Sequence, residues 1–331
     1  MAGSIRSIHV YAAAVGMGGR NLLSINDLTN EQIYALFELA RILEPWNRSR
    51  LALLADKVLC TLFFQPSTRT RMSFETAMHR LGGAVVSEAT PLLSSSAAKE
   101  ESLADMLTVV SKYANVIVLR HPDDHEALEA VTHATVPVIS GGFGNWEHPT
   151  QALMDLYTLW RVHGRIEGLR VCIASPDLVA ARTGHSMAYG LARLGAQVVL
   201  ASPAQNRTPA EVRERLAATG GSVDEMLDLD QDAFNELAAA VDLVYLPGCS
   251  APKGEEAERF KQLMDDYYLR FETLERASPE GGRIVHVTHT LPRRAGEMDT
   301  RFDDSPYQLY FEAIGHSVSL RMALLAAVLA D

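Results

Sequence analysis

Apolar and polar residues alternate along this chain with two distinct periods. Compact apolar runs predict buried strands, and apolar residues spaced three to four positions apart predict helices that cover them. The predicted strands span residues 58–64, 116–119, 136–139, 171–174, 197–201, 243–246 and 284–287. The predicted helices span residues 30–43, 70–81, 183–194, 209–218, 232–240 and 318–330. Such alternation of strand and helix is typical of parallel sheets covered on both faces.

The same rhythm occupies two halves of similar length, which predicts two doubly wound parallel-sheet α/β domains. The chain has 331 residues, enough for about two domains. We expect a flexible leader over 1–20, a first domain over 21–149 and a second over 150–305. Interdomain helices would join them, and the apolar C-terminal helix within 306–331 would pack back on the first domain.

Composition narrows the classes of partner. Lys and Arg total 30 against 41 Asp and Glu, a formal charge of −11, which disfavours nucleic acid and anionic membranes. The apolar stretch over 10–15 is too short to span a bilayer and runs into glycines, so we expect no membrane segment and no secretion signal. Three widely spaced cysteines without a Cys-x-x-Cys pair favour a reduced, cytoplasmic protein.

Candidate chemistry is concentrated where the strand over 58–64 leads into the next helix. The hydroxyl and guanidinium groups there belong to Ser67, Thr68, Arg69 and Thr70. The N–H groups of a helix's first turn attract an anion, and these side chains add donors suited to phosphate oxygens. The alternative is that Ser67 or Thr68 only caps a helix whose arginines face solvent.

The longer string from Ser67 to Glu75, Ser-Thr-Arg-Thr-Arg-Met-Ser-Phe-Glu, resembles the signature of the aspartate/ornithine carbamoyltransferase family. Further segments are similar to that family in order and spacing: 119–122, 148–157, 182–186, 289–293 and the closing apolar helix. The resemblance extends from about residue 21 to the end and is closer to the aspartate branch. It implies transfer of the carbamoyl group of carbamoyl phosphate to an amine, without a cofactor or a metal.

The resemblance also implies roles for residues of the first half. Carbamoyl phosphate would be bound by Ser67, Thr68, Arg69, Thr70, Arg120, His148 and Gln151. Among these, Arg69, Arg120 and His148 would be catalytic. The chemistry agrees, because Arg and His can stabilise the oxyanion of a tetrahedral intermediate, and the Gln carbonyl can accept from the carbamoyl NH2.

In the resembling family a loop from the neighbouring subunit completes the site. By register, Ser95 and Lys99 fall on the contributing positions, although the family often has two adjacent lysines where this chain has Ala98 and Lys99. A shared site implies at least a homotrimer, since three chains in a ring each lend a loop to the next.

The resemblance points to an α-amino acid as the acceptor of the carbamoyl group. Arg182 falls on the arginine that holds the α-carboxylate, and Leu291 falls in the loop whose backbone carbonyl would receive the α-amine. The rest of the pocket departs from the aspartate branch, because Gly248 stands for its carboxylate-binding Arg and Ser250 for its Gln. The Ser-Met-Gly loop of the ornithine branch is absent too.

Three hypotheses about the function follow, two of which differ in the acceptor. The favoured one is a non-aspartate acceptor, for example 2,3-diaminopropionate, which would give a ureido amino acid. The first alternative is aspartate itself, with Arg293, Arg294 or Lys253 restoring the positive charge. The second is a non-catalytic subunit that organises a true carbamoyltransferase.

Other enzyme classes are disfavoured by their missing motifs. A dinucleotide-binding fingerprint should follow a strand as Gly-x-Gly-x-x-Gly, but the strand ending at Ala174 continues as Ser-Pro-Asp-Leu. The glycines over 141–144 have the wrong spacing. A metal hydrolase would need ligands beyond His286 and His289, so we interpret His286 as a core or hinge histidine.

Overall fold

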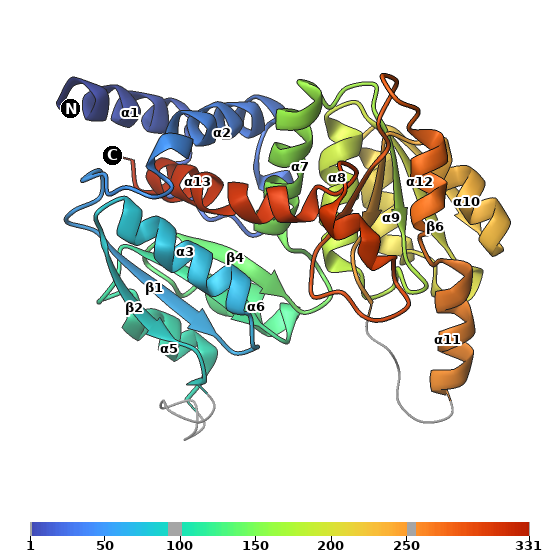
Figure 1. Cartoon of the computed structure of the whole chain (residues 1–331). Helices are drawn as coiled ribbons and strands as arrows, with labels where there is room; N and C mark the ends of the chain where they lie inside the picture. Colours follow the sequence, from blue (N-terminus) through green and yellow to red (C-terminus); the bar gives the residue numbers. More distant parts are fainter. Residues whose placement is uncertain (1, 92–100, 250–255, 331) are drawn as a thin grey trace. The chain divides into compact units, whose positions relative to one another are not determined.

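The structure is a computed structural model that describes residues 2–91, 101–249 and 256–330 (Figure 1). The chain forms two compact units, residues 1–154 with 315–331 and residues 155–314. Two helices cross from one unit to the other, α7 (Pro149–His163) and α13 (Tyr310–Val328). The sequence placed the ends of the two domains at residues 149 and 305, and the two units of the structure end at residues 154 and 314.

The first unit contains a parallel four-stranded sheet in the order β2-β1-β3-β4. Its strands are β1 (Val58–Phe63), β2 (Ala84–Glu88), β3 (Val116–His121) and β4 (Val138–Phe143). Helices α5 (Leu103–Val110) and α6 (Asp124–Val131) cover one face, where Cys60, Leu62 and Leu119 are buried among their apolar side chains. Helix α3 (Thr68–Arg80) lies on the other side of the sheet in Figure 1, and α2 (Asn30–Leu43) begins at a Thr29 capping box.

The second unit contains a parallel five-stranded sheet in the order β7-β6-β5-β8-β9. Its strands are β5 (Arg170–Ala174), β6 (Gln197–Ser202), β7 (Ser222–Leu227), β8 (Leu243–Leu246) and β9 (His286–His289). Its other helices are α8 (Arg182–Arg193), α9 (Ala210–Ala218), α10 (Gln231–Ala239), α11 (Glu256–Asp266) and α12 (Phe271–Ala277). Both sheets confirm the predicted doubly wound α/β architecture. Short 3-10 helices are formed by Ile25–Asp27, Glu44–Trp46, Ala204–Asn206 and Thr300–Asp304.

Several segments differ from the expectation, and among them strand β2 and helices α11 and α12 were not predicted. Residues Ala2–Ala14 form helix α1 instead of a flexible leader, because Ile8, Ala12 and Val15 make a helical stripe that is buried. Strand β7 was not predicted, since its residues alternate between exposed and half-buried and include two acidic side chains. Helix α13 begins at Tyr310, eight residues before the predicted start at 318.

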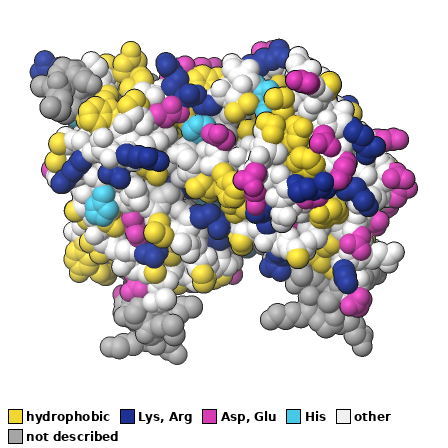
Figure 2. All heavy atoms as spheres, viewed as in Figure 1, with side chains coloured by type: hydrophobic (Ala, Val, Ile, Leu, Met, Phe, Trp, Pro, Cys, Tyr) yellow, Lys and Arg dark blue, Asp and Glu magenta, His cyan; other side chains and the backbone are white. Residues whose placement is uncertain are grey.

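The surface charge and the apolar C-terminal helix are the features that bear on binding to nucleic acid or to a membrane. Basic and acidic side chains are interspersed over the face shown in Figure 2, without a continuous basic stripe on that face. By length and composition α13 could cross a membrane, but 67% of its apolar window is buried inside the protein. A buried core helix meets the same criterion, so α13 is weak evidence for a membrane span.

A buried carboxylate ties the N-terminal segment of the first unit to the loop before α7. Glu147 is fully buried, and it accepts hydrogen bonds from Ser24 Oγ at 2.6 Å and from Ile25 N at 3.1 Å. Both donors are buried as well. Removing the carboxylate would therefore leave buried donors without this acceptor, which is costlier than losing a contact on the surface.

We predict that Glu147→Ala lowers the free energy of unfolding by about 2 kcal/mol or more. The matched control is Glu38→Ala, which removes an exposed ion pair with Arg41 and should cost less than about 1 kcal/mol. Urea unfolding followed by circular dichroism measures both changes. Equal midpoints for the two variants would show that the buried carboxylate does not stabilise this segment.

Candidate functional site

The candidate residues of the first unit lie where its strand order reverses. The chain continues from β1 to β2 on one side and from β3 to β4 on the other, so the carboxyl ends of β1 and β3 flank a gap between connections. In parallel sheets, ligands bind at this point. The register pairs Phe63 with Arg120, and Phe64 N donates to Arg120 O at 2.8 Å. The turn after β1 and Arg120 are thereby brought to the same edge.

The turn after β1 leads directly into α3. Ser67 is the N-cap residue, with φ −158° and ψ 87°, and its side chain makes no capping hydrogen bond. The alternative role of Ser67 as a simple helix cap therefore fails. Thr68 and Arg69 are exposed while Thr70 is buried. The first-turn N–H groups, the helix dipole and these side chains together suit an anion with several oxygens.

The two arginines of this motif have different surroundings. Arg71 lies 3.2 Å from Glu75 Oε1 and donates to Ser87 Oγ at 3.1 Å. Glu75 also accepts from Thr61 Oγ1 on β1 at 2.8 Å. Arg71 therefore helps to fix α3 against β1 and β2, whereas Arg69 is exposed beside the helix N-terminus.

His148 and Arg120 complete this edge of the first unit. His148 is buried; its Nε2 lies 3.5 Å from Thr70 Oγ1 and its Nδ1 lies 3.4 Å from Thr150 Oγ1. Gln151 follows three residues later in the first turn of α7, and its backbone N–H donates to His148 O at 3.1 Å. Arg120 Nη1 donates to Gly141 O at 2.9 Å.

Gly141 is a residue whose role the sequence did not reveal. A Cβ there would lie 3.2 Å from Leu119 O and 3.4 Å from Phe63 Cζ, which is tight packing against backbone and ring. In the sequence this glycine stands out only as part of the run over 141–144, whose spacing does not fit a dinucleotide fingerprint. A glycine inside a buried strand is itself the sequence signal, because it marks a place where two backbones approach closely. Here the Gly141 carbonyl approaches β3 and accepts from Arg120.

The candidate residues of the second unit also lie where a strand order reverses, here between β5 and β8. Arg182 is the first residue of α8, and burial lowers the pKa of its guanidinium from the ordinary value. Leu291 follows β9 and has φ 52°, an uncommon backbone conformation for a leucine. Three residues named above, Ser95, Lys99 and Ser250, lie outside the described residues, as does Lys253.

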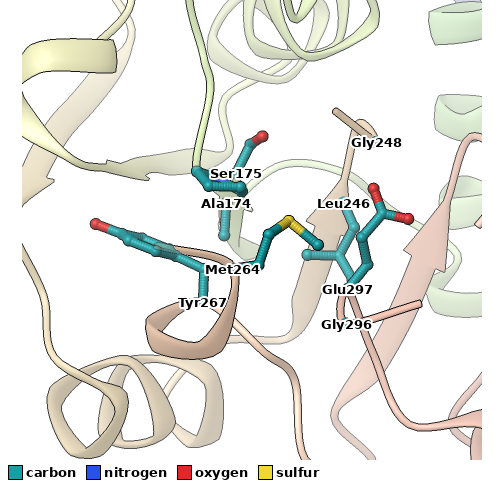
Figure 3. Close-up of a pocket in the computed structure, with 9 residues that line it drawn as sticks. Ala174, Ser175, Leu246, Gly248, Met264, Tyr267, Gly296 and Glu297 are labelled. Atoms are coloured by element: carbon teal, nitrogen blue, oxygen red, sulfur yellow. The ribbon is translucent and has the colours of Figure 1, made fainter. Parts of the chain in front are cut away.

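A pocket opens at the carboxyl edge of the second sheet (Figure 3). Its described lining consists of Ala174, Ser175, Pro176, Leu246, Gly248, Met264, Tyr267, Gly296 and Glu297. Figure 3 shows the Met264 sulfur in the middle of these residues, with Ser175 and Glu297 on opposite sides. Among these nine residues Glu297 alone carries a charged side chain.

Glu297 is held by donors on both carboxylate oxygens. Oε1 accepts from Cys249 N at 3.1 Å and lies 3.4 Å from the Cys249 thiol. Oε2 accepts from Arg294 N at 2.6 Å and from His289 Nε2 at 3.0 Å. Burial alone would raise the pKa of Glu297, but the hydrogen bond and the electrostatic attraction of His289, followed by the hydrogen bonds from Arg294 N and the Cys249 thiol, hold that pKa below its ordinary value. The carboxylate is therefore ionised at neutral pH.

His289 connects Glu297 to the loop that follows β9. Its Nε2 lies 3.0 Å from Glu297 Oε2, and Leu291 N donates to its Nδ1 at 2.8 Å. Among the nine described residues that line the pocket, the charge is that of the Glu297 carboxylate.

Cys249 is a thiol rather than a nucleophilic thiolate. Burial, followed by the Glu297 carboxylate, raises the pKa of Cys249 to about 12. Its sulfur lies 3.4 Å from the sulfur of Met264. The charge of Arg294 favours a thiolate, but burial and Glu297 outweigh it, so covalent catalysis by this cysteine is not supported.

Arg293 is not available to replace a missing pocket arginine. It forms an ion pair with Asp303, with Nη2 2.8 Å from Oδ2, and its guanidinium stacks 5.2 Å from the centre of the Tyr310 ring. Gly248 has φ 73°, a left-handed conformation that an arginine at this position would adopt only with strain. The loop backbone itself therefore differs from one built around a long side chain.

His286 behaves as the core histidine that the sequence analysis expected. It is buried at the start of β9, with its ring 5.1 Å from that of His163. Burial and then the neighbouring His163 lower the pKa of His286 to about 4, so it is neutral near pH 7.

Comparisons with known proteins agree with these two half-sites. Residues 20–161 match the family model "Aspartate/ornithine carbamoyltransferase, carbamoyl-P binding domain", and residues 167–328 match "Aspartate/ornithine carbamoyltransferase, Asp/Orn binding domain". The chain is 67% identical over 328 residues to a ureidoglycine carbamoyltransferase of Rubrobacter xylanophilus, covering 99% of this chain and 97% of that protein. It is 38% identical over 309 residues to the aspartate carbamoyltransferase catalytic subunit of Methanosarcina barkeri, covering 93% and 96%.

Solved structures give the same result. Aspartate transcarbamoylase from Trypanosoma cruzi, in complex with carbamoyl aspartate and phosphate, has a TM-score of 0.85 and 31% identity, covering 96% of this chain and 98% of that chain. The catalytic subunit of Methanocaldococcus jannaschii aspartate transcarbamoylase has a TM-score of 0.81 and 37% identity, covering 94% and 98%.

We predict that Arg69→Ala lowers kcat/KM for carbamoyl phosphate by at least about 100-fold with every acceptor, as loss of one charge-stabilising donor does in other active sites. Arg71→Ala is the comparison variant. Arg71 is paired with Glu75, so its removal should lower the stability of the protein and leave most of its affinity for carbamoyl phosphate. Steady-state phosphate release gives kcat/KM for both variants. Normal turnover by Arg69→Ala would remove the phosphate-binding role of this turn.

Proposed function

Since the chain belongs to the aspartate/ornithine carbamoyltransferase family, we propose that it transfers the carbamoyl group of carbamoyl phosphate to the amine of ureidoglycine. That the chain is a carbamoyltransferase rests on both family matches and on a relative 67% identical, which also removes the hypothesis of a non-catalytic subunit. The choice of acceptor is carried by one observation. The pocket at the edge of the second sheet presents a carboxylate, Glu297, where a dicarboxylate acceptor needs positive charge.

The chemistry of the transfer requires positioning and charge stabilisation. The neutral amine attacks the carbonyl carbon, the bond from that carbon to the phosphate oxygen breaks, and phosphate leaves with the electron pair. The departing phosphate takes the proton that the amine loses. No covalent intermediate with the enzyme is needed. In this proposal Ser67, Thr68, Arg69 and Thr70 hold the phosphate of the substrate.

The developing oxyanion would be stabilised by the groups beside that turn. Arg120, near the end of β3, donates a hydrogen bond to the Gly141 carbonyl on β4. His148 Nε2 lies 3.5 Å from Thr70 Oγ1. Both side chains can donate to an oxygen that becomes negative in the transition state. Gln151 lies in the first turn of α7, and its side-chain carbonyl would accept a hydrogen bond from the carbamoyl NH2.

Ureidoglycine fits the features on which the acceptor depends. Its central carbon carries a carboxylate, an amine and a neutral ureido group. Arg182, half-buried at the start of α8, would bind the carboxylate. The ureido group needs no arginine, which agrees with Gly248 after β8 and with Arg293 bound to Asp303. Carbamoylation of the amine gives diureidoacetate, with two ureido groups on one carbon.

Two other acceptors remain as outcomes of the test. 2,3-Diaminopropionate would place an ammonium group near Glu297, and aspartate would place a carboxylate there. The named relative favours ureidoglycine over the first, and the sign of the pocket charge disfavours the second.

Assembly and location extend the proposal. We propose a homotrimer in which Ser95 and Lys99 reach the site of the neighbouring chain, as the sequence resemblance implies. A cytoplasmic location is supported by Cys60, Cys172 and Cys249, none of which forms a disulfide.

We predict that ureidoglycine is used with a kcat/KM at least about 30-fold above that of aspartate, since losing a bidentate Arg–carboxylate pair costs about 2 kcal/mol or more. Phosphate release from carbamoyl phosphate is measured with ureidoglycine, 2,3-diaminopropionate and aspartate. Mass spectrometry should identify diureidoacetate as the product. Efficient use of aspartate by the unaltered enzyme would contradict the proposal.

We predict that Arg69→Ala and Lys99→Ala chains are each nearly inactive alone and regain partial activity when mixed after dissociation. A hybrid would contain some sites with an intact turn from one chain and an intact loop from the next. Each variant mixed with itself is the control. If hybrids form without activity, Lys99 does not act across the subunit boundary.

A further inference from the structure

Discrimination between ureidoglycine and aspartate cannot depend on size. The side group is NH–CO–NH2 in ureidoglycine and CH2–COO⁻ in aspartate, so each has four non-hydrogen atoms and ends in a planar fork. A pocket that fits one in shape fits the other. Selection must therefore come from charge and from the polarity of hydrogen bonds, including an element that repels the wrong substrate.

We infer that Glu297 is the specificity-determining residue of the acceptor pocket, where its carboxylate excludes a second carboxylate and accepts a hydrogen bond from the ureido N–H groups. This inference rests on the proposed function and names the residue that selects its acceptor.

The position of Glu297 is fixed from several directions. Its backbone carbonyl accepts from Leu269 N at 3.2 Å, and its side chain accepts from the backbone N–H groups of Cys249 and Arg294. His289 supplies a third N–H donor through Nε2. A carboxylate held by three such donors is preorganised, so it keeps its charge and orientation when a ligand enters.

One part of this carboxylate is left to a weak partner. Oε1 receives a strong hydrogen bond from Cys249 N, but its second neighbour is the Cys249 thiol at 3.4 Å. A thiol is a poor donor, whereas a ureido group offers N–H donors of full strength. An entering ureido group can therefore displace the thiol from Oε1, while a carboxylate offers no hydrogen and meets a like charge.

The test compares two substrates on the same enzyme preparation. Glu297→Gln removes the negative charge and keeps the size, although its amide NH2 must face one of the N–H donors that now bind the carboxylate. Some loss of stability is therefore expected. The ratio of kcat/KM for aspartate to kcat/KM for ureidoglycine cancels any change in the fraction of active enzyme. We expect Glu297→Gln to raise this ratio at least about 100-fold, which is about 2.8 kcal/mol at 1.4 kcal/mol per tenfold change.

A second pair of variants tests the hydrogen bond itself. Cys249→Ser places a stronger O–H donor beside Oε1 and should raise KM for ureidoglycine, whereas Cys249→Ala removes the competing donor and should not. KM for carbamoyl phosphate is the internal control and should stay unchanged in all three variants, because its proposed ligands belong to the first unit. A purely structural role of Glu297 would instead alter both substrates' parameters together.

The possible results separate the inference from the function on which it rests. If ureidoglycine is used and Glu297→Gln leaves the ratio unchanged, the role of Glu297 is overturned while the proposed function stands. If ureidoglycine is not used, the proposed function falls, and a raised ratio of aspartate to whichever neutral acceptor is used would still support exclusion by Glu297. An unchanged ratio with that acceptor overturns both.

Discussion

In each sheet of this chain the strands run parallel and their order reverses at one gap, between β1 and β3 in the first unit and between β5 and β8 in the second. Parallel pairing sends every strand's carboxyl end to the same edge, and the reversal leaves that edge free of a crossing connection at the gap. The polar groups described here depend on this constraint. Thr70 and Arg120 reach one such edge, and Arg182 and Glu297 lie around the other.

The two edges differ in electrostatic character. The first combines a helix N-terminus with Arg69 and Arg120, which suits a phosphate and the oxyanion formed during its displacement. In the proposed function the second provides Arg182 for one carboxylate and places Glu297 against another. A buried carboxylate is stable there because N–H donors from Cys249, Arg294 and His289 replace the water that it loses. This is the basis of the proposal that the acceptor is an amino acid with a single negative charge.

The predictable part of this structure is the part set by local sequence. The helix over Asn30–Leu43 and the turn from Ser67 to Thr70 follow from periodicity, a capping box and a strand–turn–helix junction. The pocket of the second unit depends on contacts that sequence spacing does not reveal, since Glu297 is hydrogen-bonded to Cys249, 48 residues earlier. The ion pair between Arg293 and Asp303 could not be predicted from the sequence either. An arginine can donate its hydrogen bonds to a carboxylate of the protein or to a ligand, and the sequence does not distinguish the two.

The electrostatic assignment of the pocket also specifies where the product should lie. A crystal structure of the enzyme with phosphate and diureidoacetate shows directly which groups contact the second ureido group. We expect a ureido nitrogen within hydrogen-bonding distance of Glu297 Oε1, at about 2.7–3.2 Å, with the Cys249 thiol displaced and the carboxylate on Arg182. A ureido group directed away from Glu297, or the product's carboxylate bound beside it, would contradict the central claim.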